Sequence, residues 1–305
     1  MTTLTWEGVY PALLTPFRED DTIDFDLYKT NLDAQVKAGV DGIILGGSLG
    51  EASSLSNAEK WDLLACSKEN LAADFPVIIN IAEQTTRAAV ELAQEAEKKG
   101  ADGLMLLPPM RYKADDRETF QYFKAVAEST SLSIMLYNNP VDYNILISLD
   151  MFADLDSCKN VQAVKESTRN TMNITRMINR FGDRYKILGG VDPIAFECLC
   201  LGADGWVAGL VDAFPAETVA IYRLIKAGRI QEALKIHRWF LPVMELDIHP
   251  KLVQYIKLAA EATGIGSSHV RAPRLPLEGK ELQTVKEVID QALATRPELP
   301  DYLNI

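Results

Sequence analysis

One lysine in this chain lies in a setting that is unusual for a charged side chain. Lys165 stands near the end of Val161–Ser167, a mostly apolar run of the kind that forms a buried strand. An unpaired ammonium is costly to bury, and a lysine in a dry pocket loses proton affinity until its amine is neutral near neutral pH. A neutral amine can attack a ketone and form a Schiff base. Taken alone, the pattern also fits the commoner lysine whose stem is buried and whose head reaches water.

Two other segments place polar groups directly after apolar runs. Gly46–Glu51 combines the hydroxyl of Ser48 with backbone N–H groups between glycines, and such a loop can bind a small carboxylate. Tyr137 ends the apolar run Ser133–Tyr137, where its hydroxyl could relay a proton to a bound substrate. Each segment also has an ordinary interpretation, as a plain glycine turn and as a core tyrosine with a hydrogen-bonded hydroxyl.

Short apolar runs alternate with amphipathic segments along the chain, as alternating strands and helices require. We expect strands at Val9–Leu14, Gly42–Leu45, Val77–Ile81, Gly103–Leu107, Ser133–Tyr137, Val161–Lys165, Lys186–Gly189 and Gly205–Ala208. Three similar junctions, Gly39–Gly42, Gly100–Gly103 and Gly202–Gly205, stand between a helix and a strand, and their first glycine is suited to end the helix. This repeat predicts a (β/α)8 TIM barrel. A doubly wound open sheet is the alternative, but Val9–Phe17 lacks the glycine-rich turn typical of that fold.

The barrel is expected to occupy residues 1–214. Residues 215–305 would supply its last helix and a C-terminal helical extension packed on the barrel, all as a single structural unit. The helical patterns there are Glu217–Ala227, Ile230–Phe240, Lys251–Thr263 and Lys280–Ala294. Active sites of such barrels lie at the C-terminal ends of the strands. Lys165, Tyr137 and Gly46–Glu51 should therefore meet at one end of the barrel.

Composition excludes several classes of protein. The net charge of −12 over 305 residues disfavours a nucleic-acid partner or an anionic membrane surface. Residues 1–7 lack the basic and apolar regions of a signal peptide, and no apolar run is long enough to span a membrane. The four cysteines lack zinc-ligand spacing, which favours a cytoplasmic protein with reduced thiols. We expect no metal, because none of the histidines has a partner at ligand spacing; these are His237, His249 and His269.

The candidate segments together resemble the dihydrodipicolinate synthase / N-acetylneuraminate lyase family of Schiff-base-forming barrel enzymes. The resemblance covers nearly the whole chain and rests on four motifs, Gly8–Phe17, Gly47–Glu51, Tyr137–Pro140 and Lys165–Ser167. It implies a lyase that acts on a small 2-keto acid or cyclic imine carboxylate through a Schiff base. It also implies a homotetramer built as a dimer of dimers, and it requires no cofactor because the lysine imine is itself the electron sink.

Position by position, the resemblance implies a role for each motif residue. Lys165 would be the Schiff-base lysine and Tyr137 the phenol that relays protons. Ser48 and the backbone of Leu49 and Gly50 would bind the α-carboxylate of the keto acid. Two further residues would line the pocket, namely Gly190 and Val207.

Several positions depart from the pattern of the family. Leu49 stands where a second hydroxyl residue is usual. Asp142 stands where the synthases carry an arginine, and its charge would repel the carboxylate of aspartate semialdehyde. Arg111 and Tyr112 replace tyrosines that follow the strand-four proline, and we expect them near the distal part of a different substrate.

These departures favour a dehydratase or deaminase of a hydroxylated pyrroline carboxylate or sugar acid. The alternatives are dihydrodipicolinate synthase, which joins pyruvate and aspartate semialdehyde, and a keto-sugar-acid aldolase. A keto-acid-binding regulator without catalysis is the alternative outside enzymes. The presence of both Lys165 and Tyr137 disfavours it.

Overall fold

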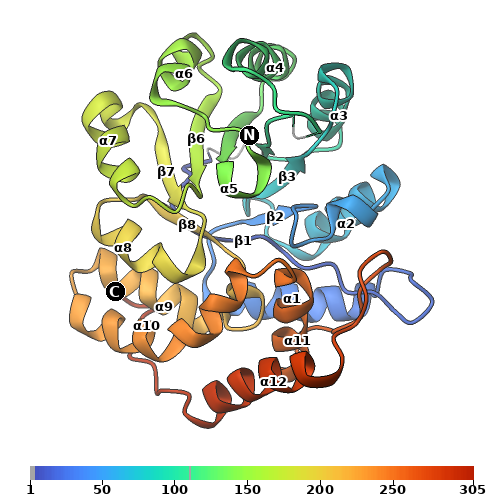
Figure 1. The fold of residues 1–305 in the computed structure, drawn as a ribbon, viewed down its shortest axis with the longest axis vertical. Helices are drawn as coiled ribbons and strands as arrows, with labels where there is room; N and C mark the ends of the chain where they lie inside the picture. The colour runs from blue at the N-terminus through green and yellow to red at the C-terminus, as the bar shows by residue number, and fades with distance from the viewer. Residues whose placement is uncertain (1–3, 110) are drawn as a thin grey trace.

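The computed structural model describes residues 4–109 and 111–305, and within them eight parallel strands form one sheet. The strand order is β1-β8-β7-β6-β5-β4-β3-β2, and a parallel bridge between Ala12 and Ile44 joins its two ends. The sheet therefore closes into a barrel, and the predicted (β/α)8 fold is confirmed (Figure 1). The strands are β1 (Gly8–Pro11), β2 (Ile43–Leu45), β3 (Val77–Ile81), β4 (Gly103–Leu106), β5 (Ser133–Asn138), β6 (Val161–Glu166), β7 (Lys186–Gly189) and β8 (Gly205–Ala208).

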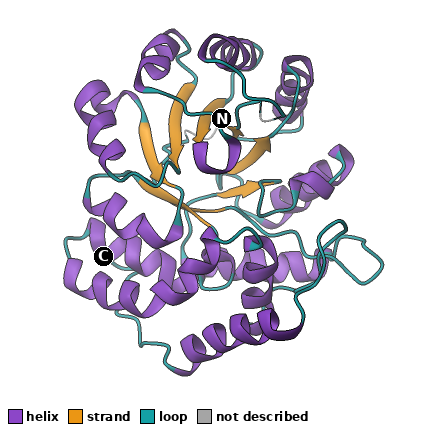
Figure 2. Cartoon of the chain, in the orientation of Figure 1, coloured by secondary structure: helices purple, strands orange, loops and turns teal. Residues whose placement is uncertain are grey.

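Helices surround the strands (Figure 2). They are α1 (Phe25–Ala38), α2 (Asn57–Asn70), α3 (Thr86–Lys98), α4 (Asp116–Glu128), α5 (Pro140–Tyr143), α6 (Leu149–Asp154), α7 (Met172–Phe181), α8 (Ala195–Cys200), α9 (Pro215–Lys226), α10 (Ile230–Met244), α11 (Leu252–Ala262) and α12 (Gly279–Ala294). Because helices cover the outside and side chains fill the inside, β1 to β4 and β8 are buried along their whole length. None of the helices described is both long and apolar enough to cross a membrane.

The three repeated junctions have one structure. Their first glycines all adopt positive φ, at 87° for Gly39, 84° for Gly100 and 104° for Gly202. The aspartate of each junction accepts a hydrogen bond from the backbone N–H of a neighbouring strand. These bonds are Val9 N–H to Asp41 at 2.8 Å, Val77 N–H to Asp102 at 2.8 Å and Ile187 N–H to Asp204 at 2.9 Å. The repeat thus fastens neighbouring strands at the end of the barrel opposite the candidate site.

The observed strand ends differ from the predicted ones by a few residues. The first strand ends at Pro11 rather than Leu14, because Leu13 and Leu14 already belong to the loop over the barrel end. Two strands continue one residue further than expected, to Asn138 in β5 and Glu166 in β6. Both of these polar side chains are buried, and the amide of Asn138 donates to Glu166 at 3.3 Å.

The C-terminal extension packs on one side of the barrel (Figure 1). It consists of α10, a short 3-10 helix η6 (Glu245–Ile248), α11 and α12. The helix η6 lies against the segment after β7, and α11 lies against the segment after β8. Two parts of the extension therefore reach the C-terminal ends of the strands. That this extension and residues 1–214 form a single structural unit stays a prediction.

Candidate active site

Lys165 and Tyr137 lie side by side at the C-terminal ends of neighbouring strands. They are paired in the register of β5 and β6, and the Lys165 Nζ atom is 4.2 Å from the centroid of the Tyr137 ring. Both side chains are largely buried, with 7% and 8% of their surface exposed. Both line one cavity of about 660 Å³ that opens to solvent. The barrel thus joins two candidates that are 28 residues apart in the sequence.

The amine of Lys165 has no hydrogen bond or ion pair with any residue that the structure describes. Burial lowers the pKa of Lys165, because the ammonium loses its hydration. The carboxylate of Asp247 opposes this shift most strongly, followed by Tyr143, Asp192 and Asp142. A lysine with a lowered pKa has more neutral amine at a given pH, which is the form that attacks a carbonyl.

Gly190, at the end of β7, leaves the space that Lys165 occupies. A Cβ atom at position 190 would lie 2.6 Å from Lys165 Cγ and 2.8 Å from Lys165 Cε. It would also lie 2.2 Å from the hydroxyl oxygen of Ser167, which donates a hydrogen bond to the Gly190 carbonyl at 3.0 Å. Any larger residue would displace the lysine. Gly190 and Val207, which the family resemblance places at the pocket, both line the cavity, and their contact with substrate stays a prediction.

The hydroxyl of Tyr137 is buried and hydrogen-bonded. Burial raises its pKa above the usual value, so the phenol stays protonated at neutral pH. The Asn139 side-chain amide donates to this hydroxyl at 3.2 Å and to Asp142 at 2.7 Å. The same side chain caps α5, because its oxygen accepts the backbone N–H of Asp142 at 3.2 Å. One asparagine therefore fixes the phenol and the start of α5 together.

The Ser48 hydroxyl faces the same cavity and forms a 2.6 Å hydrogen bond with the hydroxyl of Tyr143. The Tyr143 ring meets the Tyr137 ring edge to face, with 5.5 Å between centroids. The N–H groups of Leu49 and Gly50 have no hydrogen-bond partner among residues 4–109 and 111–305. A hydroxyl beside free N–H groups suits a carboxylate.

Close packing shapes this loop. A Cβ atom on Gly50 would lie 2.7 Å from the backbone oxygen of Leu13, so only glycine fits there. The Thr15 hydroxyl donates to the Gly50 carbonyl at 2.9 Å. Leu49 lines the cavity although it is almost fully buried, while Gly50 is buried and is not among the lining residues.

Three charged side chains line the outer part of the cavity. Asp142 comes from α5, Arg169 from the segment after β6, and Asp247 from η6 of the C-terminal extension. Burial, reinforced by the charge of Asp192, raises the pKa of Asp247 to about 8. The Asp247 carboxylate accepts the backbone N–H of Asp192 at 3.2 Å. Asp192 is itself held by Trp206 Nε1 at 2.9 Å, which ties this wall to the barrel.

Two predicted residues lie away from the cavity. Arg111 and Tyr112 are exposed on a turn after β4 and do not contribute to the lining. Their neighbour Met110 lies outside the described residues, as do residues 1–3 of the N-terminal segment assessed above. The role predicted for Arg111 and Tyr112 at the distal part of a substrate stays a prediction.

Three polar side chains of the cavity lie outside the segments that the sequence analysis singled out. Tyr143 stands six residues after Tyr137, and its position at the end of a helical turn could have indicated it. Arg169 has a positive φ of 59°, and no sequence pattern indicated either this conformation or its place at the cavity. Asp247 lies 82 residues after Lys165 in the sequence, and only the packing of the extension brings it to the same cavity.

A closed (β/α)8 barrel with an unpaired lysine and a tyrosine at its strand ends defines a Schiff-base enzyme of the class I aldolase type. The sequence matches the Dihydrodipicolinate synthetase family over residues 5–292. The chain therefore belongs to this family, whose members include lyases, and the resemblance seen in the sequence is confirmed.

Individual relatives agree with this assignment. The 4-hydroxy-tetrahydrodipicolinate synthase 1 of Halalkalibacterium halodurans is 30% identical over 282 residues, which cover 92% of this chain and 96% of the relative. The structure of dihydrodipicolinate synthase DapA-2 from Bacillus anthracis is 28% identical, with a TM-score of 0.90 over 97% of this chain and 100% of that one. YagE, a prophage protein of Escherichia coli K12 solved in complex with pyruvate, is 28% identical, with a TM-score of 0.87 over 95% and 99%.

Proposed function

We propose that this enzyme forms a Schiff base between Lys165 and the C2 carbonyl of a small 2-keto acid. One observation carries the proposal: the buried, unpaired Lys165 amine lies in a cavity shared with Tyr137 and Ser48. The complex of the related protein YagE with pyruvate supports a keto acid of this size. Because no ion pair with a described residue holds the Lys165 amine in its charged form, its lowered pKa is enough to make it a nucleophile.

The chemistry follows from the geometry. The Lys165 amine attacks C2, and the resulting carbinolamine loses its oxygen as water when the protonated Tyr137 hydroxyl supplies a proton. The cationic imine then withdraws electrons from C3. The Tyr137 phenolate that this step leaves can take up a C3 proton to give an enamine, or a bond further along the chain can break. The Tyr137 hydroxyl regenerated in this way can return the proton at the end of the cycle.

The loop after β2 would hold the substrate in the orientation that this attack requires. The Ser48 hydroxyl and the N–H groups of Leu49 and Gly50 would bind the α-carboxylate. The bond between Ser48 and Tyr143 supports this role, because it fixes the serine oxygen at the edge of the cavity. Leu49 in place of a hydroxyl residue removes one side-chain donor from the site but leaves the backbone donor.

Two observations bear on the reaction that follows imine formation, namely the names of the relatives and the charges of the cavity. The names of the relatives favour the synthase reaction of pyruvate with aspartate semialdehyde, which the sequence analysis gave as the alternative. They favour it over the dehydratase or deaminase reaction that was expected first. At about 30% identity, however, the names do not distinguish reactions within one family.

The charges of the cavity favour the dehydratase or deaminase reaction. Asp142 and Asp247 both line the cavity with Lys165. The negative charge of Asp142 would repel the second carboxylate of the synthase reaction, whereas Asp247, with a pKa raised to about 8, is mostly protonated at neutral pH and adds little to this repulsion. Hydroxyl groups of a hydroxylated pyrroline carboxylate or sugar acid could instead donate hydrogen bonds to the carboxylate of Asp142. Arg169 on the same rim is the cation that would serve the synthase reaction.

A pair of assays on purified protein decides between the two reactions. One follows condensation of pyruvate with aspartate semialdehyde, and the other follows loss of water or ammonia from a hydroxylated pyrroline carboxylate. A kcat/KM of about 10⁴ M⁻¹s⁻¹ or more is the ordinary enzymatic range. The reaction that reaches it is the function, and the carboxylate argument is wrong if that reaction is the condensation.

The assembly and location implied by the family resemblance also belong to this proposal. We expect a homotetramer built as a dimer of dimers, in the cytoplasm, with no nucleic-acid or membrane partner. Light scattering on the purified protein measures the assembly directly. A monomer in solution would contradict that part of the proposal.

A further inference from the structure

The loop that would bind the carboxylate ends at a residue with an unusual backbone. Glu51 adopts φ 60° and ψ 40°, a left-handed conformation that side chains other than glycine rarely take. Its N–H donates to the Ser48 carbonyl at 3.2 Å, and the following Ala52 N–H donates to the Gly47 carbonyl at 3.1 Å. The conformation of Glu51 therefore sets the path of the Ser48–Gly50 turn.

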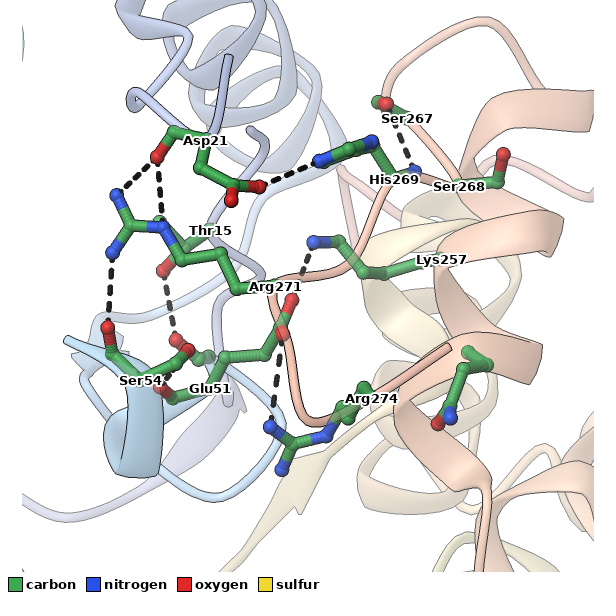
Figure 3. Close-up of polar contacts among 12 residues, drawn as sticks. Thr15, Asp21, Glu51, Ser54, Lys257, Ser267, Ser268, His269, Arg271 and Arg274 are labelled. Carbon is green, nitrogen blue, oxygen red and sulfur yellow. Dashed lines mark hydrogen bonds and ion pairs between the residues drawn. The ribbon is translucent and has the colours of Figure 1, made fainter. Parts of the chain in front are cut away.

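The Glu51 side chain points toward Lys257 and Arg274 of the C-terminal extension (Figure 3). Its Oε1 atom lies 2.5 Å from the Nζ atom of Lys257, which belongs to α11. Its Oε2 atom lies 3.7 Å from the guanidinium of Arg274. Glu51 and Lys257 are both fully buried, and neither lines the cavity. A strained backbone persists where the surrounding structure holds it, and here that hold is an ion pair.

Aromatic packing completes the arrangement around this pair. The Lys257 ammonium lies 4.5 Å from the centroid of the Phe17 ring, and the Arg271 guanidinium lies 4.1 Å from the same ring. Phe17 comes from the loop after β1, beside the Thr15 that binds the Gly50 carbonyl. Through Lys257, the C-terminal extension thus contacts both the loop after β2 and the loop after β1.

We propose that Lys257, acting through Glu51, is a positioning residue that sets the affinity of the Ser48–Gly50 loop for the substrate carboxylate. The inference rests on the proposed function, since it concerns the same loop. It assigns to the C-terminal extension a task in substrate binding although Lys257 does not touch the substrate. The free N–H groups of a turn bind an anion only while the turn keeps its shape.

Two carbonyl compounds separate this role from a purely structural one. Pyruvate and hydroxyacetone are both methyl ketones, but only pyruvate carries a carboxylate. Each is incubated with protein and borohydride, and mass spectrometry measures the concentration that gives half-maximal labelling of Lys165. In Lys257→Met this concentration should rise about tenfold for pyruvate, since small displacements of a positioning group are costly. It should not change for hydroxyacetone.

Two further variants make the test decisive. Glu51→Gln/Lys257→Met removes both charges, which proteins often tolerate better than one unpaired buried charge. It should show the same selective loss for pyruvate, because the hold on the turn is still absent. Lys251→Met is the matched control: this lysine lies just before α11, pairs with Glu281 at 2.5 Å and should label like the wild type.

The outcomes are distinct. Equal losses for both ketones, no loss for pyruvate, or wild-type labelling of the double variant would each overturn the positioning role. A wild-type protein that fails to label with pyruvate contradicts the proposed function itself, and the inference then falls with it. A double variant that folds and loses only pyruvate supports the inference even when Lys257→Met alone does not fold.

Discussion

Three lysines of the described chain are buried, and their partners distinguish them. Lys257 is paired with Glu51 at 2.5 Å, and Lys60 lies 3.8 Å from Glu83. Lys165 faces the Tyr137 ring instead of a carboxylate. Burial lowers the pKa of all three lysines, and the carboxylates in contact with Lys60 and Lys257 oppose that shift. At the scale of single residues, the absence of such a contact among the described residues supports the proposed role of Lys165 as the nucleophile.

Removal of the Tyr137 hydroxyl should slow the reaction without preventing imine formation. Tyr137→Phe keeps the ring beside Lys165 and deletes only the proton donor. We expect kcat to fall by roughly 10²–10⁴, the usual contribution of a general acid–base group. Stopped assays on purified protein measure this. Tyr222→Phe, at a tyrosine of α9 outside the cavity, is the control. Wild-type turnover in Tyr137→Phe would leave this tyrosine with a packing role alone.

Replacement of Asp142 should change the preference for the second substrate. Asp142→Arg places a cation where the cavity now has a carboxylate. At 4 Å and an effective dielectric constant near 20, one unit-charge interaction is about 4 kcal/mol before screening. The variant loses the repulsion of the Asp142 carboxylate and gains the attraction of the arginine. Even if each effect contributes only a quarter of this value, kcat/KM for aspartate semialdehyde should rise more than about tenfold.

The control for this prediction is Asp33→Arg, the same change at an exposed position on α1. It should leave the synthase activity as it is in the wild type. If both variants respond alike, the net charge of the protein and not the cavity governs the second substrate. If neither responds, Asp142 does not meet that substrate.

At the scale of elements, the repeated junctions made the barrel predictable. Glycines that end helices and apolar runs that form strands are local signals, so the order and approximate ends of all eight strands followed from the sequence. Lys165, Tyr137 and Ser48 were found for the same reason, since each ends a strand or directly follows one. The strand ends themselves were less certain, because backbone pairing and not side-chain pattern decides them.

The loop after β2 carries the prediction that belongs to this scale. Ser48→Ala should weaken pyruvate binding by about 1–3 kcal/mol, the cost of a missing hydrogen bond to a charged acceptor. Labelling of Lys165 as a function of pyruvate concentration measures the change. Leu49→Thr should tighten binding by restoring a second hydroxyl. Ser157→Ala, at an exposed serine outside the cavity, should have no effect. Unchanged binding in Ser48→Ala would place the carboxylate elsewhere.

At the scale of the whole molecule, the C-terminal extension supplies what the sequence concealed. Asp247 and Lys257 lie in or beside its helices, and their local sequence is that of ordinary amphipathic segments. Only the way in which η6 and α11 pack on the barrel brings the first to the cavity and the second to Glu51. No pattern of period two or 3.6 encodes such packing, which is why the sequence did not reveal these residues.

The stability of the whole protein should depend on the protonation of Asp247. Its pKa is raised to about 8, whereas an unfolded aspartate titrates near about 3.9. Between these values the folded protein holds a proton that the unfolded chain has lost, so this group makes stability fall as the pH rises. Asp247→Asn cannot ionise, and its melting temperature should fall less between about pH 5 and pH 8.

Asp192, Lys165 and Asp142 face this position in both proteins. Because the charge of Asp247 raises the pKa of Lys165, the difference between the two proteins reports this carboxyl group together with its effect on the lysine. Thermal unfolding followed by circular dichroism at several pH values gives the two slopes. Equal slopes in the wild type and in Asp247→Asn would show that this carboxyl group titrates normally in the folded protein.

Covalent capture tests the central claim most directly. Wild-type protein is incubated with pyruvate and borohydride, digested and mapped by mass spectrometry. We expect one reduced pyruvyl group per chain, located on Lys165 and absent from Lys165→Ala. Because the pKa of Lys165 is lowered, labelling should already level off below about pH 10.4, the pKa of an ordinary lysine. Labelling on another lysine, or no labelling by pyruvate or any other keto acid, would contradict the assignment of Lys165 as the Schiff-base residue.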